Sequence, residues 1–83
     1  MTNQSATCVQ FEISPRFRRT LEQRVQRLER DADFDETQVA RLADEDHIRR
    51  QLRLVAAERM EALRIRLFLD RARTRAHKAS AEL

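Results

Sequence analysis

The chain has no glycine, tryptophan or tyrosine among its 83 residues, and it has only one proline and one cysteine. A phosphate-binding loop of the Walker or dinucleotide type needs glycine where the backbone approaches the phosphate, so both motifs are excluded. The single cysteine, Cys8, cannot form a disulfide within the chain. Because there is also no signal peptide and no apolar run of about 18 residues or more, we expect a cytoplasmic protein without membrane contact.

The short length and the composition together predict the fold class. Charged residues make up 37% of the chain, which suits long amphipathic helices better than a sheet sandwich. A chain of this size forms one domain at most and buries little apolar surface by itself. We therefore expect a mainly α protein with a short N-terminal β-strand, two or three helices of which the last is long, and assembly into a homodimer.

The net charge of +3 hides a strong pattern along the chain. Residues 1–30 carry +3, residues 31–46 carry −6 and residues 47–78 carry +7. The basic parts could form a surface for a polyanion. Alternatively, they are solvated arginine-rich helices that pair with the acidic segment, and composition alone favours this second interpretation.

Local patterns divide the chain into segments. Residues 1–6 are polar and are expected to be disordered. Residues 8–13 alternate like a strand, with Val9, Phe11 and Ile13 on one side. Ser14 and Pro15 then form a strong helix start, as N-cap and first helical residue. We expect this helix over residues 15–30, with a single apolar stripe.

The acidic segment predicts a short helix over residues 35–44, with Asp35 as a candidate N-cap. It begins like a calcium loop, but Glu36 stands where that loop needs glycine and Leu42 where it needs a bidentate glutamate. A long helix follows over residues 47–76, with Asp44 or Asp46 as a candidate cap. Residues 78–83 form a tail that is expected to fray.

The long helix carries two apolar stripes on nearly opposite sides. One contains Ile48, Leu52, Val55, Ala56, Met60, Leu63 and Leu67, and the other contains Leu54, Ala62, Ile65, Leu69, Ala72 and Ala76. We expect a helix with two stripes to pack against its own chain on one side and against another chain on the other side. The residues that we expect at a dimer or partner interface are Val9, Phe11, Leu52, Val55, Met60, Leu63, Ile65, Leu67 and Leu69.

Catalytic and metal-binding residues are not predicted anywhere in the chain. His47 and His77 lie 30 residues apart, and neither is accompanied by the further protein ligands that a zinc site needs. Cys8 lies in the strand and lacks the polarised setting of a catalytic thiol. We therefore expect no enzyme activity, no metal, no cofactor and no small-molecule substrate.

Two stretches resemble a known family of small DNA-binding proteins. "VQFEISPRFRRTLEQRV" resembles the opening of the ribbon-helix-helix repressors of bacteria and phages, and "HIRRQLRLVAAERMEALR" resembles the second helix of plasmid-stability antitoxins of that family. The resemblance covers residues 7–30 and 47–64. It implies that two N-terminal strands pair across a dimer axis and enter the DNA major groove.

This resemblance also implies roles for individual residues. Gln10 and Glu12 would face the groove, and Val9, Phe11 and Ile13 would face the helices. Arg16 and Arg18 would hold phosphate. The start of the first helix adds Ser14 and Arg19 to the expected DNA contacts, since helix N-termini with nearby arginines attract phosphate.

The alternative is a helical protein-binding module of the kind that phage or plasmid inhibitors and adaptors provide. In that case the two stripes of the long helix build a dimer or bundle, and the strand adds to the sheet edge of a partner or packs as an arm. A membrane-surface helix fits less well, because such a helix needs one apolar face rather than two.

Overall fold

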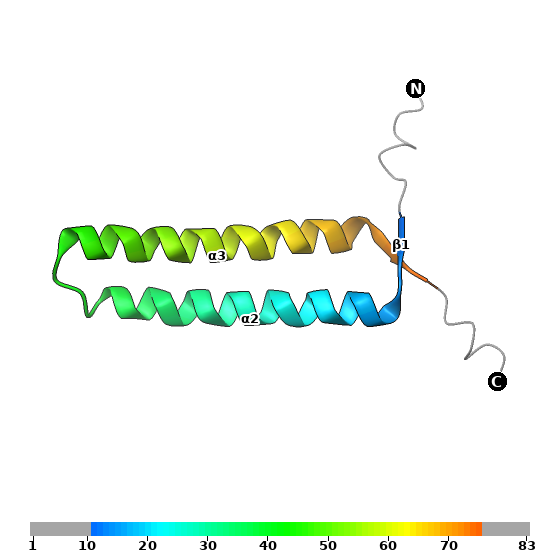
Figure 1. Cartoon of the computed structure of the whole chain (residues 1–83), viewed down its shortest axis with the longest axis horizontal. Coiled ribbons are helices and arrows are strands. Elements are labelled where there is room, and N and C mark those ends of the chain that lie inside the picture. The colour runs from blue at the N-terminus through cyan, green and yellow to red at the C-terminus, as the bar shows by residue number, and fades with distance from the viewer. Residues whose placement is uncertain (1–10, 76–83) are drawn as a thin grey trace, which may run out of the picture.

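The computed structural model of the chain describes residues 11–75. They form β1 (Phe11–Ile13), α2 (Pro15–Val39), α3 (Glu45–Arg71) and β2 (Ala72–Thr74), in that order. The two helices lie side by side as an antiparallel hairpin, and both strands lie at its open end (Figure 1). The prediction of a mainly helical chain with a short N-terminal strand is confirmed.

The start of α2 is as predicted, but its end is not. Ser14 caps the helix by accepting a hydrogen bond from the backbone N–H of Phe17 at 3.0 Å, and Pro15 is its first residue. The helix then continues to Val39 instead of ending near residue 30. The separate acidic helix over residues 35–44 therefore does not form, because its first half is part of α2.

Contacts with α3 explain why the acidic segment remains helical. Arg59 of α3 pairs with Asp33 at 3.3 Å and also with Glu36, which offsets the repulsion among the acids. The side chain of Gln51 donates to the backbone oxygen of Asp35 at 2.9 Å. Ala32 continues the apolar stripe and is fully buried. None of these contacts can be recognised from the sequence of α2 alone.

A short turn without glycine joins the helices. Ala40 keeps a right-handed backbone conformation with φ of −64°, and the N–H groups of Arg41 and Leu42 donate to carbonyls of the last turn of α2. Asp44 then caps α3 by accepting from the N–H of His47 at 3.1 Å. Of the two predicted caps for the long helix, Asp44 is the one used.

The long helix ends at Arg71, earlier than the predicted residue 76, and the next three residues form β2. β2 pairs with β1 in parallel, with Phe11 opposite Ala72 and Ile13 opposite Thr74. The N–H of Arg75 extends the ladder by donating to the oxygen of Ile13 at 2.8 Å. Local sequence indicates no second strand, so this pairing is decided by the tertiary structure.

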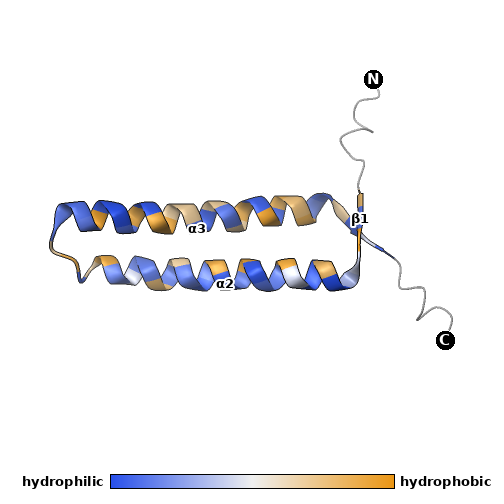
Figure 2. Ribbon diagram, in the orientation of Figure 1, coloured by the Kyte–Doolittle hydropathy of each residue, from blue (hydrophilic) through white to orange (hydrophobic). Residues whose placement is uncertain are grey.

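The core is a thin layer between the two helices. Val25 of α2 packs against Ala62 and Ile65 of α3, with Leu21, Leu28 and Leu69 around them. Figure 2 shows hydrophobic and hydrophilic residues alternating along both helices, as expected for amphipathic helices. Because a hairpin has a single helix–helix interface, the side of each helix that faces away from the partner helix is left uncovered.

Neither α2 nor α3, the two helices described within residues 11–75, is long and apolar enough to cross a membrane.

Candidate protein-binding surface

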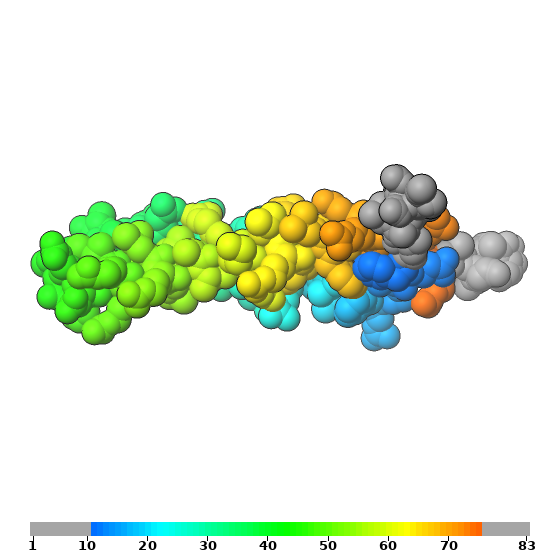
Figure 3. Space-filling view, turned by 90° about the horizontal axis from the view of Figure 1, so that it is seen from above, coloured from blue at the N-terminus to red at the C-terminus, as the bar shows by residue number. Residues whose placement is uncertain are grey.

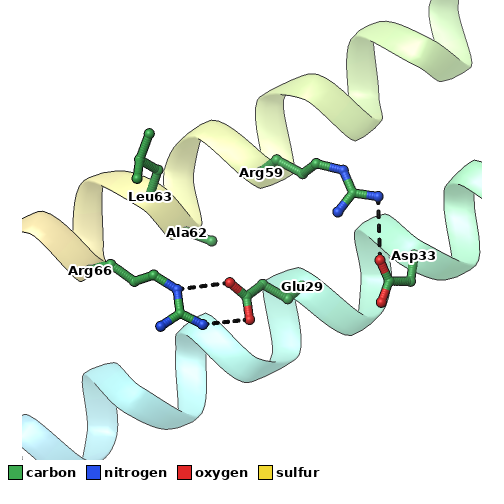
Figure 4. A pocket seen from close by; sticks show the side chains of 6 residues that line it. All are labelled: Glu29, Asp33, Arg59, Ala62, Leu63 and Arg66. Carbon is green, nitrogen blue, oxygen red and sulfur yellow. Dashed lines mark hydrogen bonds and ion pairs between the residues drawn. The ribbon is translucent and has the colours of Figure 1, made fainter.

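One side of the hairpin is covered by ion pairs between the helices. Arg66 forms two parallel hydrogen bonds with Glu29, at 2.8 and 2.9 Å, and Arg59 pairs with Asp33 one turn along (Figure 4). These pairs border an open hollow of about 410 Å³ that Ala62 also lines. All four charged side chains remain substantially exposed, so they fix how the helices meet more than they stabilise the fold.

One carboxyl group lies between the helices rather than on their surface. Glu58 is half-buried, and its Oε1 atom is buried without a hydrogen-bond partner among residues 11–75. Burial raises the pKa of this carboxyl, and the nearby carboxylates of Asp35 and Asp31 raise it further, against the opposing effect of Arg59. Ionised Glu58 is therefore unfavourable for the packing of α2 on α3.

Arg18 joins the start of α2 to the end of α3 and to β2, at the open end of the hairpin. Its guanidinium donates to the carbonyl oxygens of Leu69 at 3.2 Å and Ala72 at 3.1 Å, and to the hydroxyl of Thr74 at 2.5 Å. The last carbonyls of a helix have no partners within the helix, and a cation there also suits the helix dipole. Arg18 therefore acts as a cap for α3 that comes from α2.

Aromatic side chains cluster beside this end. The rings of Phe11 and Phe68 lie 4.8 Å apart, and Phe17 meets Phe68 edge-on at 6.4 Å. Phe17 and Phe68, together with Leu21 and Ile65, border an open apolar hollow of about 280 Å³. The cluster joins β1 to α3 and α3 to α2, and it leaves part of each ring exposed.

The side of α3 that faces away from α2 carries a row of uncovered apolar residues. We call this row the outer stripe, and it consists of Leu52, Ala56, Met60, Leu63 and Leu67. At 100° per residue they span only about 80° of the helix circumference. The four large members are each about half exposed. Figure 3 looks onto the α3 side of the hairpin, with α2 partly hidden behind it.

Arginines border the outer stripe along both edges. Arg53 and Arg64 follow one edge, and Arg59 and Arg66 follow the other, as their helical spacing places them. Carboxylates are absent from this side of α3 between residues 49 and 67, since Glu58 faces α2 and Glu61 pairs with Arg24 of α2 at 3.6 Å. The uncovered surface is therefore apolar along its centre and positive along the edge with Arg53 and Arg64, whereas the arginines of the other edge are paired with carboxylates of α2.

The residues predicted for DNA contact have diverse surroundings. Ser14 is the cap of α2, and Arg18 is engaged with α3 and β2 as described. Glu12 is exposed and lies 3.8 Å from Arg75. Arg16 and Arg19 are exposed, with no carboxylate of residues 11–75 within ion-pair distance. Gln10 lies outside the described residues.

The residues predicted for a dimer or partner interface separate into two groups. Leu52, Met60, Leu63 and Leu67 are uncovered, as an interface requires. For the other group the prediction needs correction: Val55 and Ile65 are buried, and Leu69 packs on Val25 and Ala62 of the same core. They face the chain's own α2 and not a separate chain. Phe11 belongs to the aromatic cluster, and Val9 lies outside the described residues.

The pairing of Arg59 with Asp33 and Glu36 agrees with the interpretation that the arginine-rich helices pair with the acidic segment, but the individual pairs of Arg59 and Arg66, and the capping by Arg18, were not identified from the sequence. Helical spacing places the first two arginines beside the outer stripe, but their partners lie 23 to 37 positions away along the chain. A regular charge pattern within one helix cannot reveal such distant partners.

Residues 11–75 contain no group of three histidine, cysteine or carboxylate side chains that could hold a metal ion. Comparisons of the chain with protein-family models, curated proteins and solved structures found no match.

Proposed function

We propose that this chain is a helical protein-binding module, and that the outer stripe of α3 is the surface that binds another protein chain. The observation that carries the proposal is the row of half-exposed Leu52, Met60, Leu63 and Leu67 on one side of α3. Scattered apolar residues are normal on a protein surface, but a continuous row at helical spacing is the pattern of a helix–helix seam.

The thin core supports this proposal. The buried apolar residues of the described chain are Ile13, Val25, Ala32, Val55, Ala62 and Ile65, and none of the large ones is fully buried. Covering one large apolar side chain contributes about 1.5 to 3 kcal/mol. Burial of the outer stripe by a partner therefore adds stabilisation that a single hairpin lacks. The homodimer expected from the sequence is one way to cover it.

Site-specific photo-crosslinking tests the proposal in cells that produce the chain. Leu63 and Leu54 are 47% and 45% exposed, and both lie on α3, but only Leu63 belongs to the outer stripe. A photoreactive phenylalanine analogue at position 63 should form a defined protein adduct, and the same group at position 54 should not. Equal adducts at both positions, or none at position 63, would contradict the proposal.

DNA binding is a second candidate, favoured by the two exposed arginines at the start of α2. Arg16 and Arg19 have no carboxylate of residues 11–75 within ion-pair distance, and helix N-termini favour phosphate. Pairing of β1 with β2 and the use of Arg18 as a cap compete with a DNA-reading ribbon, because they occupy one edge of β1 and one of the expected phosphate ligands.

A titration of duplex DNA against salt tests this second candidate. The double variant Arg16→Ala and Arg19→Ala should lower the salt dependence of binding by about one unit of slope for each phosphate that is no longer neutralised. Arg18→Ala is unsuitable as a probe, because it removes hydrogen bonds within the fold. Absence of DNA binding at low salt would exclude the ribbon-helix-helix function.

A further inference from the structure

We propose that the occupant of the outer stripe is an amphipathic helix of a different protein, with an apolar face bordered by aspartate or glutamate. This inference rests on the proposed function, and it adds the chemical class of the partner. The outer stripe runs from Leu52 to Leu67, which corresponds to about 22 Å of helix. A partner helix of four to five turns would cover it, with side chains of one face at coiled-coil spacing.

Charge is the observation that selects this partner. Arg53 and Arg64 border the stripe on one side, and Arg59 and Arg66 border it on the other. Residues that border an apolar seam decide which helix pairs with it, because opposite charges across the seam attract and like charges repel. Because Arg59 and Arg66 already pair with carboxylates of α2, a helix with acidic residues matches this surface along the edge that carries Arg53 and Arg64.

The four arginines differ in whether they already form ion pairs with carboxylates of the same chain. Arg59 and Arg66 are held by carboxylates of α2, which orders their side chains along one edge. On the other edge, Glu61 is the only carboxylate of residues 11–75 that pairs with Arg64, at 3.3 Å, and the Arg64 side chain is 69% exposed. Arg53 has no carboxylate of the described chain within ion-pair distance. Acidic residues of a partner would find Arg53 and Arg64 available.

A second copy of the chain matches the surface less well in the antiparallel orientation than an acidic helix does. If two copies pack antiparallel through α3, a two-fold axis brings each edge against the same edge of the other copy, so Arg53 approaches Arg64. If they pack parallel, the edge with Arg53 and Arg64 meets the edge with Arg59 and Arg66. Arginine faces arginine in the antiparallel case, and no carboxylate of α3 lies between residues 49 and 67 on this side to relieve it. In the parallel case Arg59 and Arg66 are already paired with carboxylates of α2, so a parallel pair of copies is one of the outcomes that the experiment distinguishes.

Two synthetic peptides with the same apolar face separate these possibilities. One has the sequence of α3, and the other has that sequence with glutamate in place of its outer arginines. Both carry Val55→Gln and Ile65→Gln, so that neither can replace α3 against α2. The exchanged positions are Arg49→Glu, Arg53→Glu, Arg59→Glu, Arg64→Glu, Arg66→Glu and Arg71→Glu.

Affinity for the whole protein is measured by calorimetry at low and high salt. The glutamate peptide should bind at least about tenfold more tightly than the arginine peptide at about 50 mM salt, and the difference should shrink at about 500 mM. Leu63→Ser in the protein should weaken binding strongly, and Leu54→Ser, at a matched exposed leucine, should leave it unchanged.

Other outcomes overturn the inference and separate it from the proposed function. Equal or tighter binding of the arginine peptide that Leu63→Ser abolishes would refute an acidic partner but retain the outer stripe as a binding surface. A second result would also refute an acidic partner but retain the outer stripe. In that result neither peptide binds, and the protein sediments as a dimer that Leu63→Ser dissociates. The occupant of the stripe is then a second copy of the chain. A monomer that binds neither peptide, or binding that Leu63→Ser leaves intact, would refute both.

Discussion

Arg18, near the start of α2, donates to the carbonyl oxygen of Ala72, just after the end of α3, at 3.1 Å. The same guanidinium reaches the oxygen of Leu69 and the hydroxyl of Thr74. One side chain therefore connects the first helix, the end of the second helix and the second strand. The resemblance to DNA-binding repressors implies phosphate contact for this residue, whereas in the described structure its donors are directed into the fold.

Replacing Arg18 with alanine should destabilise the hairpin by about 1.5 to 3 kcal/mol, because the variant lacks the hydrogen bonds from a charged donor to partly buried carbonyls. Arg19→Ala, at the next and exposed position, should change stability by no more than about 0.5 kcal/mol. Urea denaturation measures both variants. Amide hydrogen exchange should also show faster exchange of the Arg75 N–H in Arg18→Ala. Equal stability of the two variants would contradict the capping role.

Replacing Glu58 with glutamine should stabilise the fold at neutral pH. The pKa of Glu58 in the fold lies above its ordinary value of 4.5, chiefly because of burial and then because of Asp35. The protonated form therefore favours folding, and its contribution is fully present below pH 4.5 and is lost as the pH rises through the raised pKa. The gain from Glu58→Gln should shrink as the pH falls towards 4.5.

Glu61→Gln is the control for this pH dependence. Glu61 lies one turn along the same helix and pairs with Arg24 and Arg64, so its replacement should leave stability unchanged or lower it by up to about 1 kcal/mol. Thermal unfolding of both variants at several pH values measures the effect. A parallel pH profile for Glu58→Gln and the unmodified protein would show that Glu58 does not titrate in this way.

Enlarging a small residue in the core between the helices should be costly. Ala62 is almost fully buried in the core, beside Val25 and Ile65. Ala62→Leu should destabilise the hairpin by about 1 to 3 kcal/mol, because the extra atoms force the helices apart. Ala57→Leu, at an exposed position of the same helix, should change stability by no more than about 0.5 kcal/mol. Urea denaturation of the two variants provides the comparison.

The bidentate pair of Glu29 and Arg66 should contribute modestly to stability. Its side chains are 39% and 55% exposed, so water and salt weaken the attraction. A double-mutant cycle with Glu29→Ala and Arg66→Ala should give a coupling energy of about 0.2 to 1 kcal/mol, smaller at high salt. A coupling that high salt does not reduce would indicate that packing, rather than charge, joins the two side chains.

Local signals predicted the beginnings of the helices well and their ends poorly. Ser14 with Pro15, and Asp44, are caps whose effect depends only on the residues that immediately follow, and both caps are used. Arg59 of α3 pairs with Asp33 and Glu36 in the last part of α2, and Arg18 of α2 donates to the carbonyls of Leu69 and Ala72 at the end of α3. These partners are distant in sequence, so no window along the chain contains the signal.

The candidate binding surface was predicted in part for the same reason. The spacing of apolar residues showed that α3 carries two stripes, but not which residues of each would be covered. Val55 and Ile65 were assigned to a partner interface and are instead buried in the hairpin. The choice required the position of α2, which passes over one side of α3 and leaves the outer stripe exposed.

The sequence by itself determined that this chain forms long amphipathic helices with defined starts, because caps and apolar periodicity act over a few residues. The tertiary structure alone decided that β1 would pair with β2 and that Arg18 would close the open end of the hairpin. It also decided which apolar stripe would remain uncovered. Each of these outcomes depends on groups that only the packing of α2 against α3 brings together.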